Sequence, residues 1–160
     1  MELRNYLQTS PSLDELRNHL RITSHDLDGE LLAKLRAATL SAEHEISTVI
    51  ALSSFTLTRD FATAITLRYP LVEVESVKVD GVALATEEYS VRHGTLILAT
   101  EGTSVEVCYK AGLAQVPEDI KAAILLLAGS LFNNPTDRPE ERDRTTARNL
   151  LRPYRNWGEC

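Results

Sequence analysis

The chain has few of the residues that most often build catalytic or metal sites. Its 160 residues include only two cysteines, four histidines and seven glycines. The cysteines, Cys108 and Cys160, have the spacing of neither a metal site nor a disulfide framework. The sequence contains no HxxxH or CxxC pair and no glycine-rich phosphate loop. We therefore predict no catalytic residue, no metal and no cofactor, and a reduced intracellular setting is the simplest interpretation of the cysteines.

A long apolar run and an excess of positive charge are also missing. No stretch is apolar for long enough to cross a bilayer, and the N-terminus does not resemble a signal peptide. The 17 basic and 23 acidic side chains give a net charge of −6. This balance argues against general affinity for nucleic-acid backbones. The apolar fraction of 43% is sufficient for a hydrophobic core.

Two helices are predicted near the N-terminus. Residues 12–15 (SLDE) have the pattern of a capping box and precede a short leucine-rich helix that ends near Arg21. A longer helix is expected over residues 27–52, where apolar residues recur at helical spacing. We expect Asp26 or Asp28 to cap its N-terminus.

Residues 53–110 have the short alternating segments of an antiparallel sheet. Residues 72–79 alternate between valine and polar residues, which predicts one valine face. Asp80-Gly81 and His93-Gly94 are predicted hairpin turns, because these residue types tolerate positive φ. Residues 1–10 have one apolar edge and could form either a helical or an extended arm.

The most apolar stretch, residues 117–132, is predicted to be the central core helix. A further helix is expected to end near Leu151. These elements predict an α+β fold, in which an N-terminal helix pair, a central apolar helix and a C-terminal helix form a helical core with an inserted antiparallel β meander. We expect residues 1–52, 53–112 and 113–160 to be its three parts, within one structural unit.

The C-terminal segment is rich in arginine. Pairs of arginines four residues apart are mildly unfavourable on an isolated helix, so an acidic neighbour would stabilise this one. A second copy of this acidic chain could supply that neighbour, although a solvated helix with local ion pairs is an equally good interpretation. The candidate inter-subunit residues are Arg138, Arg142, Arg144 and Arg148.

The last residues combine aliphatic, aromatic and arginine side chains, which dominate binding hot spots. The segment is therefore a candidate docking element for a partner. The alternative is that Tyr154 and Trp157 fold back onto their own core. The candidate docking residues are Leu150, Leu151, Arg152, Pro153, Tyr154, Arg155 and Trp157.

Two stretches resemble the head–tail connector proteins of tailed bacteriophages, also called head-completion or adaptor proteins. They are Y-x-A-G-x…V-P-x-x-I-K-x-A-I-L-L-L at residues 109–127 and L-L-x-P-Y-R at residues 150–155. The helical opening with L-R-I-T and an acidic loop, at residues 20–28, supports the resemblance. The order of the expected elements extends it over nearly the whole chain.

The resemblance implies a structural role rather than an enzymatic one. Connectors assemble as a ring, usually of twelve copies, beneath the capsid portal, where they extend the DNA channel and present a surface to the stopper or tail-completion protein. DNA would pass without sequence-specific binding, and the protein would be made in the bacterial host cytoplasm and reside at the head–tail interface of the virion, with no membrane partner. In this family the C-terminal segment tends to reach the portal, which implies that role for residues 150–155.

Two other classes of function stay open. One is a monomeric module that binds a peptide along an exposed strand edge. The other is a small enzyme whose site is assembled from scattered residues such as Glu88, Tyr89 and His93.

Overall fold

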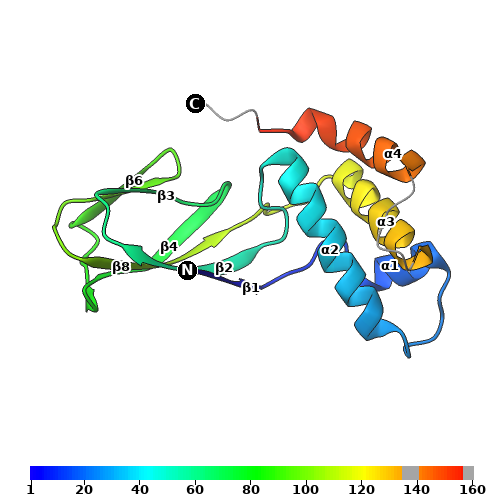
Figure 1. Cartoon of the computed structure of the whole chain (residues 1–160), viewed down its shortest axis with the longest axis horizontal. Helices are drawn as coiled ribbons and strands as arrows, with labels where there is room; N and C mark the ends of the chain where they lie inside the picture. Colours follow the sequence, from blue (N-terminus) through cyan, green and yellow to red (C-terminus); the bar gives the residue numbers. More distant parts are fainter. Residues whose placement is uncertain (135–140, 157–160) are drawn as a thin grey trace. The chain divides into compact units, whose positions relative to one another are not determined.

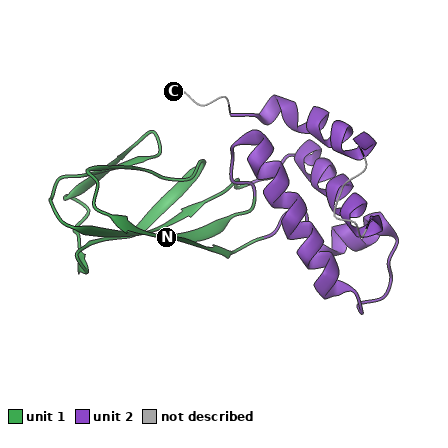
Figure 2. Ribbon diagram, viewed as in Figure 1, with its two compact units in different colours: residues 1–8, 51–114 green, residues 9–50, 115–160 purple. Residues whose placement is uncertain are grey.

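The computed structural model describes residues 1–134 and 141–156, and it has the predicted α+β class. Figure 1 shows the helices and strands along the chain. The chain divides into two compact units (Figure 2), one made of residues 1–8 and 51–114 and the other of residues 9–50 and 115–160. We call them the sheet unit and the helical unit. The first eight residues, which sequence analysis grouped with the helices, therefore lie with the strands.

The sheet unit contains two sheets in which all strand pairs are antiparallel, as predicted. The larger sheet has the order β1 (Glu2–Tyr6), β2 (Ser53–Asp60), β8 (Ser104–Ala111), β4 (Leu71–Val79) and β5 (Val82–Ala83). The smaller sheet has the order β3 (Ala64–Thr66), β7 (Thr95–Leu98) and β6 (Tyr89–Arg92). The order is not that of a single meander, because β8 lies between β2 and β4. The N-terminal arm takes the extended alternative and becomes the edge strand β1.

A buried tyrosine connects β1 to the core of the sheet unit. Tyr109 is fully buried and stacks on Phe55, with 5.2 Å between ring centroids. Its hydroxyl donates a hydrogen bond of 2.7 Å to Glu2 Oε1 on β1, and Arg68 donates to the other carboxylate oxygen. Burial and the neighbouring carboxylate raise the pKa of Tyr109. Burial alone would raise the pKa of Glu2, but the hydrogen bonds from Arg68 and Tyr109 lower it.

Both predicted hairpin turns are present, since Asp80, Gly81, His93 and Gly94 all have positive φ. The predicted valine face on β4 is present for Val74, Val77 and Val79, which lie opposite three buried residues of β8. The prediction is wrong for Val72, which lies at the first of two register shifts and is 53% exposed. Such bulges let a strand change which side chains it buries.

The first turn is held by an unusual number of hydrogen bonds to one carboxylate. Asp80 accepts from the backbone amides of Thr103 and Ser104, at 3.1 and 2.8 Å, and from both of their hydroxyl groups. The bonds from Thr103 and Ser104 lower the pKa of Asp80 to about 2. The charged carboxylate therefore connects this turn to the start of β8.

We expect Asp80→Asn to lower the urea midpoint of the protein at neutral pH, because asparagine keeps the turn conformation but accepts fewer bonds and carries no charge. The pKa of Asp80 is lower in the folded than in the unfolded state, so the contribution is complete above about pH 4 and is lost as pH falls toward 2. Urea titrations of both proteins at pH 7, 3.5 and 2.5 test this. A difference between them that stays constant over this range would contradict the assignment.

The helical unit contains α1 (Leu13–Leu20), α2 (Asp28–Ile46), α3 (Glu118–Asn133) and α4 (Glu141–Leu151), followed by a 3₁₀ turn at Arg152–Tyr154. The prediction that α3 is the central helix is confirmed, since it packs against α1, α2 and α4. The predicted capping box is also present: Ser12 and Glu15 exchange hydrogen bonds between side chain and backbone. No helix among the described residues is long and apolar enough to span a membrane. The core of the unit comprises Leu16, Leu31, Leu35, Ala38, Ile46, Ile120, Ile124, Ala147 and Leu151.

The predicted bounds of α2 need correction at both ends. The helix ends at Ile46 rather than at residue 52, because Ser47 adopts the left-handed conformation with φ of 54°. The buried carboxylate of Glu43 then accepts a 2.8 Å hydrogen bond from the amide of Ile50, which stabilises the chain beyond the helix. At the other end neither predicted aspartate caps the helix: Leu27 is the N-cap and makes no side-chain bond.

Candidate interaction site along the C-terminal helix

Helix α4 has one buried side and one side lined with arginine. Ala147 and Leu151 are almost fully buried, and α4 packs against α3 and, less extensively, α2. Arg144 and Arg148 are four residues apart and share one face of α4, and Arg152 follows at the start of the 3₁₀ turn. The local sequence thus produces a row of guanidinium groups beside a buried apolar side.

A surface groove runs beside this row of arginines. It consists of two hollows of about 60 and 190 Å³, and both are lined by Glu45, Arg148 and Leu151. The smaller hollow is also lined by Arg144, and the larger one by Arg152 and Arg155. We call this the arginine groove and define it by Glu45, Arg144, Arg148, Leu151, Arg152 and Arg155.

The charge of the arginine groove is only partly balanced within the chain. Arg148 Nε lies 3.3 Å from Glu45 Oε2 on α2, and this is an ion pair between two helices. Within residues 1–134 and 141–156, neither Arg144 nor Arg152 has an acidic partner. The groove therefore carries excess positive charge. Guanidinium groups bind carboxylates with two parallel hydrogen bonds, so this chemistry suits an acidic protein segment.

Not all of the predicted inter-subunit arginines come together. Arg144 and Arg148 line the arginine groove. Arg142 is exposed, but at 100° per residue it points about 160° away from Arg144 around the helix axis. Arg138 lies outside the described residues. The residue that sequence analysis missed is Glu45, because nothing in the spacing shows which carboxylate of the chain faces the arginines.

The predicted docking residues divide between the core and the surface. Leu151 is 2% exposed, Leu150 is half-buried, and Arg152, Pro153 and Arg155 are exposed. Tyr154 folds back onto the helical unit, where its hydroxyl donates to Asp119 Oδ2 at 3.3 Å. Burial and the nearby Asp119 raise the pKa of Tyr154. Trp157 lies outside the described residues. Only part of the segment is therefore available to a partner.

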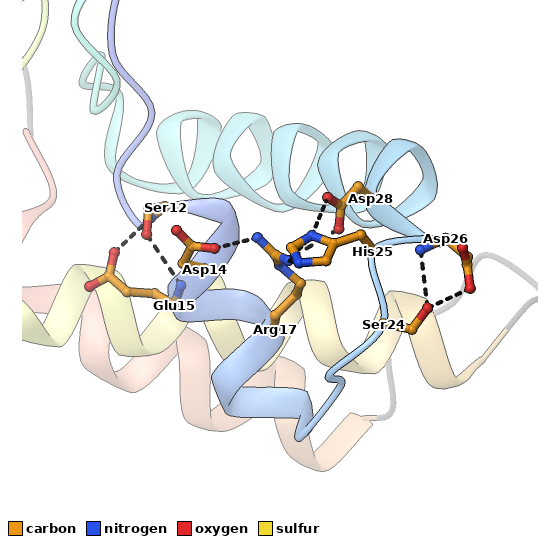
Figure 3. Close-up of polar contacts among 8 residues, drawn as sticks. All are labelled: Ser12, Asp14, Glu15, Arg17, Ser24, His25, Asp26 and Asp28. Atoms are coloured by element: carbon orange, nitrogen blue, oxygen red, sulfur yellow. Dashed lines mark hydrogen bonds and ion pairs between the residues drawn. The ribbon is translucent and has the colours of Figure 1, made fainter.

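A second polar cluster lies in the loop between α1 and α2 (Figure 3). Arg17 contacts the carboxylate of Asp14 and the ring of His25, and its Nε lies 3.6 Å from Asp28 Oδ1. His25 Nδ1 lies 3.2 Å from Asp28 Oδ2. Asp26 stands outside this group and accepts a 2.6 Å hydrogen bond from the hydroxyl of Ser24. The cluster fixes the loop and leaves some of its acidic side chains exposed.

The residues of the enzyme alternative do not form a site. Glu88 and His93 flank opposite ends of strand β6, so their backbones are about 17 Å apart at 3.4 Å per residue. The carboxylate of Glu88 accepts a hydrogen bond from the amide of Ala85 instead. Among the described residues, no group of three or more His, Cys, Asp or Glu side chains could hold a metal ion.

The fold and this groove define a small α+β chain with an arginine-lined groove on its surface. No protein-family model and no curated protein matches the sequence. Solved structures do match it over 99% of this chain and 97% of theirs. They include chains in the neck of an empty gene transfer agent (GTA) particle computed with C6 symmetry (TM-score 0.72, 21% identity) and in the neck of a native GTA particle computed with C12 symmetry (0.71, 19%). A chain in the virion of a native GTA particle also matches (0.69, 21%). At this level of identity the likeness shows a shared fold.

Proposed function

We propose that this chain is a structural neck protein of a phage-like particle, a head–tail connector without enzymatic activity. The observation that carries the proposal is the end-to-end structural match to chains in GTA necks, with a TM-score of 0.72 and almost complete coverage of both chains. A match of this extent includes both units. The sequence resemblance to connectors supports the same function independently.

The proposed assembly is a ring of twelve copies beneath the portal. The similar GTA necks were computed with C6 and C12 symmetry, and a ring needs two different surfaces on each copy. DNA would pass through the ring without sequence-specific binding. A net charge of −6 repels the phosphate backbone, which favours passage over retention. The protein would be made in the host cytoplasm and reside in the virion, where it would also meet a stopper or tail-completion protein.

Within this assembly, we assign portal docking to the C-terminal residues and contacts between copies to the arginines of the C-terminal segment. The exposed side chains of Arg152, Pro153 and Arg155 suit the first role. The exposed Arg142 and Arg144 suit the second. Leu151 supports both roles indirectly, because its burial holds α4 on the helical unit.

Deleting residues 152–160 is expected to leave the fold intact and abolish attachment to purified portal rings. The contacts that the deletion removes include the Tyr154–Asp119 hydrogen bond and the bond from the amide of Asn156 to the carbonyl of Ile46. Circular dichroism checks the fold, and co-sedimentation with portal rings measures attachment. The double substitution of Arg152 and Arg155 by alanine is the matched variant that retains both contacts. Attachment of the truncated protein at wild-type strength would refute the docking role.

A monomeric binding module remains the second candidate, because the sheet order places β1 at an edge of the larger sheet. Leu3 on this strand is 56% exposed and Leu7 beyond it is 48% exposed. An added peptide strand could pair with such an edge. A protein that stays monomeric with and without portal rings, but binds an extended peptide along β1, would favour this module over the connector.

A further inference from the structure

We propose that the arginine groove of one copy receives the acidic loop of the next copy in the ring. The acidic loop is the exposed end of the α1–α2 connection and the first turn of α2, defined by Asp26, Leu27 and Glu30. This inference rests on the proposed function, because it names the two surfaces that meet between neighbouring connector subunits.

The groove supplies the cationic half of the contact. Its Arg148 is already paired with Glu45 of the same chain, at 3.3 Å. Arg144 precedes Arg148 by four residues on α4, and Arg152 follows it by four residues at the start of the 3₁₀ turn. Neither has an acidic partner in the part of the chain that the structure describes. Two carboxylates brought to these positions would also remove the repulsion along the helix between arginines four residues apart.

The loop supplies the anionic half. Asp26 and Glu30 are exposed, and neither has a cationic partner among the described residues. Asp26 bonds only to Ser24, while the neighbouring Asp28 is engaged with Arg17 and His25 (Figure 3). Leu27 stands between the two free carboxylates and is 39% exposed. An apolar side chain flanked by carboxylates complements a groove that is lined by Leu151 and by arginines.

The arginine groove and the acidic loop of one copy lie too far apart to contact each other. Glu45 in the groove and Asp28 beside the loop lie near opposite ends of α2. Seventeen helical residues separate them by about 26 Å at 1.5 Å per residue. The contact is therefore heterologous, with one surface meeting a different surface on the next copy, and repetition of such a contact produces a ring when the rotation closes.

Two charge-reversed proteins test the contact through loss and recovery of assembly. The first carries Arg144→Glu and the second carries Glu30→Arg, so that Arg152, to which portal docking is assigned, stays unchanged. Arg148, Glu45 and Asp28 stay unchanged because they hold the fold. Each protein alone brings like charges together, so we expect its self-association to weaken at least about tenfold. Mixed in equal amounts, the two proteins should form rings of alternating subunits, because every groove then meets a loop of opposite charge.

Sedimentation velocity measures assembly of each protein alone and on portal rings, and circular dichroism checks the fold. The control carries Arg59→Glu, the same change of charge on an exposed arginine of the sheet unit, and should assemble like the wild type. A wild-type protein that forms no ring under either condition overturns the proposed function. Wild-type rings with unaffected assembly of the reversed proteins overturn only this inference. Loss of assembly in both proteins without recovery on mixing also overturns it, since the two surfaces would then have other partners.

Discussion

Replacing Gly112 by alanine is expected to destabilise the sheet unit by about 4 kcal/mol, the sum of overpacking and backbone strain. Gly112 follows β8 and has φ of +139°, which side-chain-bearing residues rarely adopt. An added Cβ would lie 2.6 Å from Leu52 Cα and 2.8 Å from its backbone nitrogen. Backbone atoms cannot rotate away, so the strands must separate. Because small domains have total stabilities of about 5–15 kcal/mol, the unit should be close to unfolding.

Gly81→Ala is the matched control for this substitution. Gly81 also has positive φ, at +82°, but an added Cβ would meet nothing within 4 Å. Its cost should be limited to the left-handed backbone, at about 1–2 kcal/mol. Urea unfolding of both variants, followed by circular dichroism, gives the comparison. Equal losses of stability would show that the close approach of residues 52 and 112 does not constrain the fold.

Leu151→Ala is expected to cost about 2–5 kcal/mol of stability in the isolated protein, as for other large apolar side chains removed from a core. Leu151 is 2% exposed and is one of two residues, with Ala147, that α4 buries. Its loss should release α4 from α3 and disrupt the arginine groove. Assembly and portal attachment should therefore fail together as a secondary effect of unfolding at this helix.

Leu150→Ala is the control that distinguishes a role of Leu151 in the core from a role in docking. Leu150 is only half-buried, so its truncation should cost less than about 1.5 kcal/mol. Thermal and urea unfolding are measured without any partner present. If Leu151→Ala leaves stability unchanged but weakens attachment to portal rings, then Leu151 contacts the portal directly and its burial in the isolated chain is not maintained in the assembly.

Features that depend on neighbouring residues were predictable from the sequence. The capping box at Ser12 and Glu15, the turn at Asp80-Gly81 and the apolar helix α3 each follow from short-range chemistry. The end of α2 was predicted too late, because apolar spacing continues through residue 50. The left-handed turn at Ser47 and the hydrogen bond from the Ile50 amide to the Glu43 carboxylate, seven residues back, decide that boundary instead.

Features that depend on distant residues were not predictable. Alternation predicts strands, but pairing β8 with both β2 and β4 depends on which faces can be buried together. The role of Glu2 is similar, since its carboxylate meets Tyr109 across 107 residues of sequence. At the candidate site the row of arginines was visible from its spacing. Its pairing with Glu45 required the packing of α4 beside α2.

Two features of the charged surfaces favour the proposed role in assembly over the alternative of a small enzyme. The arginine groove is open to solvent and is lined by side chains suited to carboxylates, while its counterpart of opposite charge lies at the far end of α2. Such an arrangement is the one that the proposed connector would use for contacts between copies and with partners.

Electron microscopy of the assembled protein, alone and on purified portal rings, tests the ring most directly. The proposed function predicts end-on views in which identical copies surround an open axis wide enough for duplex DNA. Folded protein that appears only as separate monomers or as two-fold dimers in both preparations would contradict it.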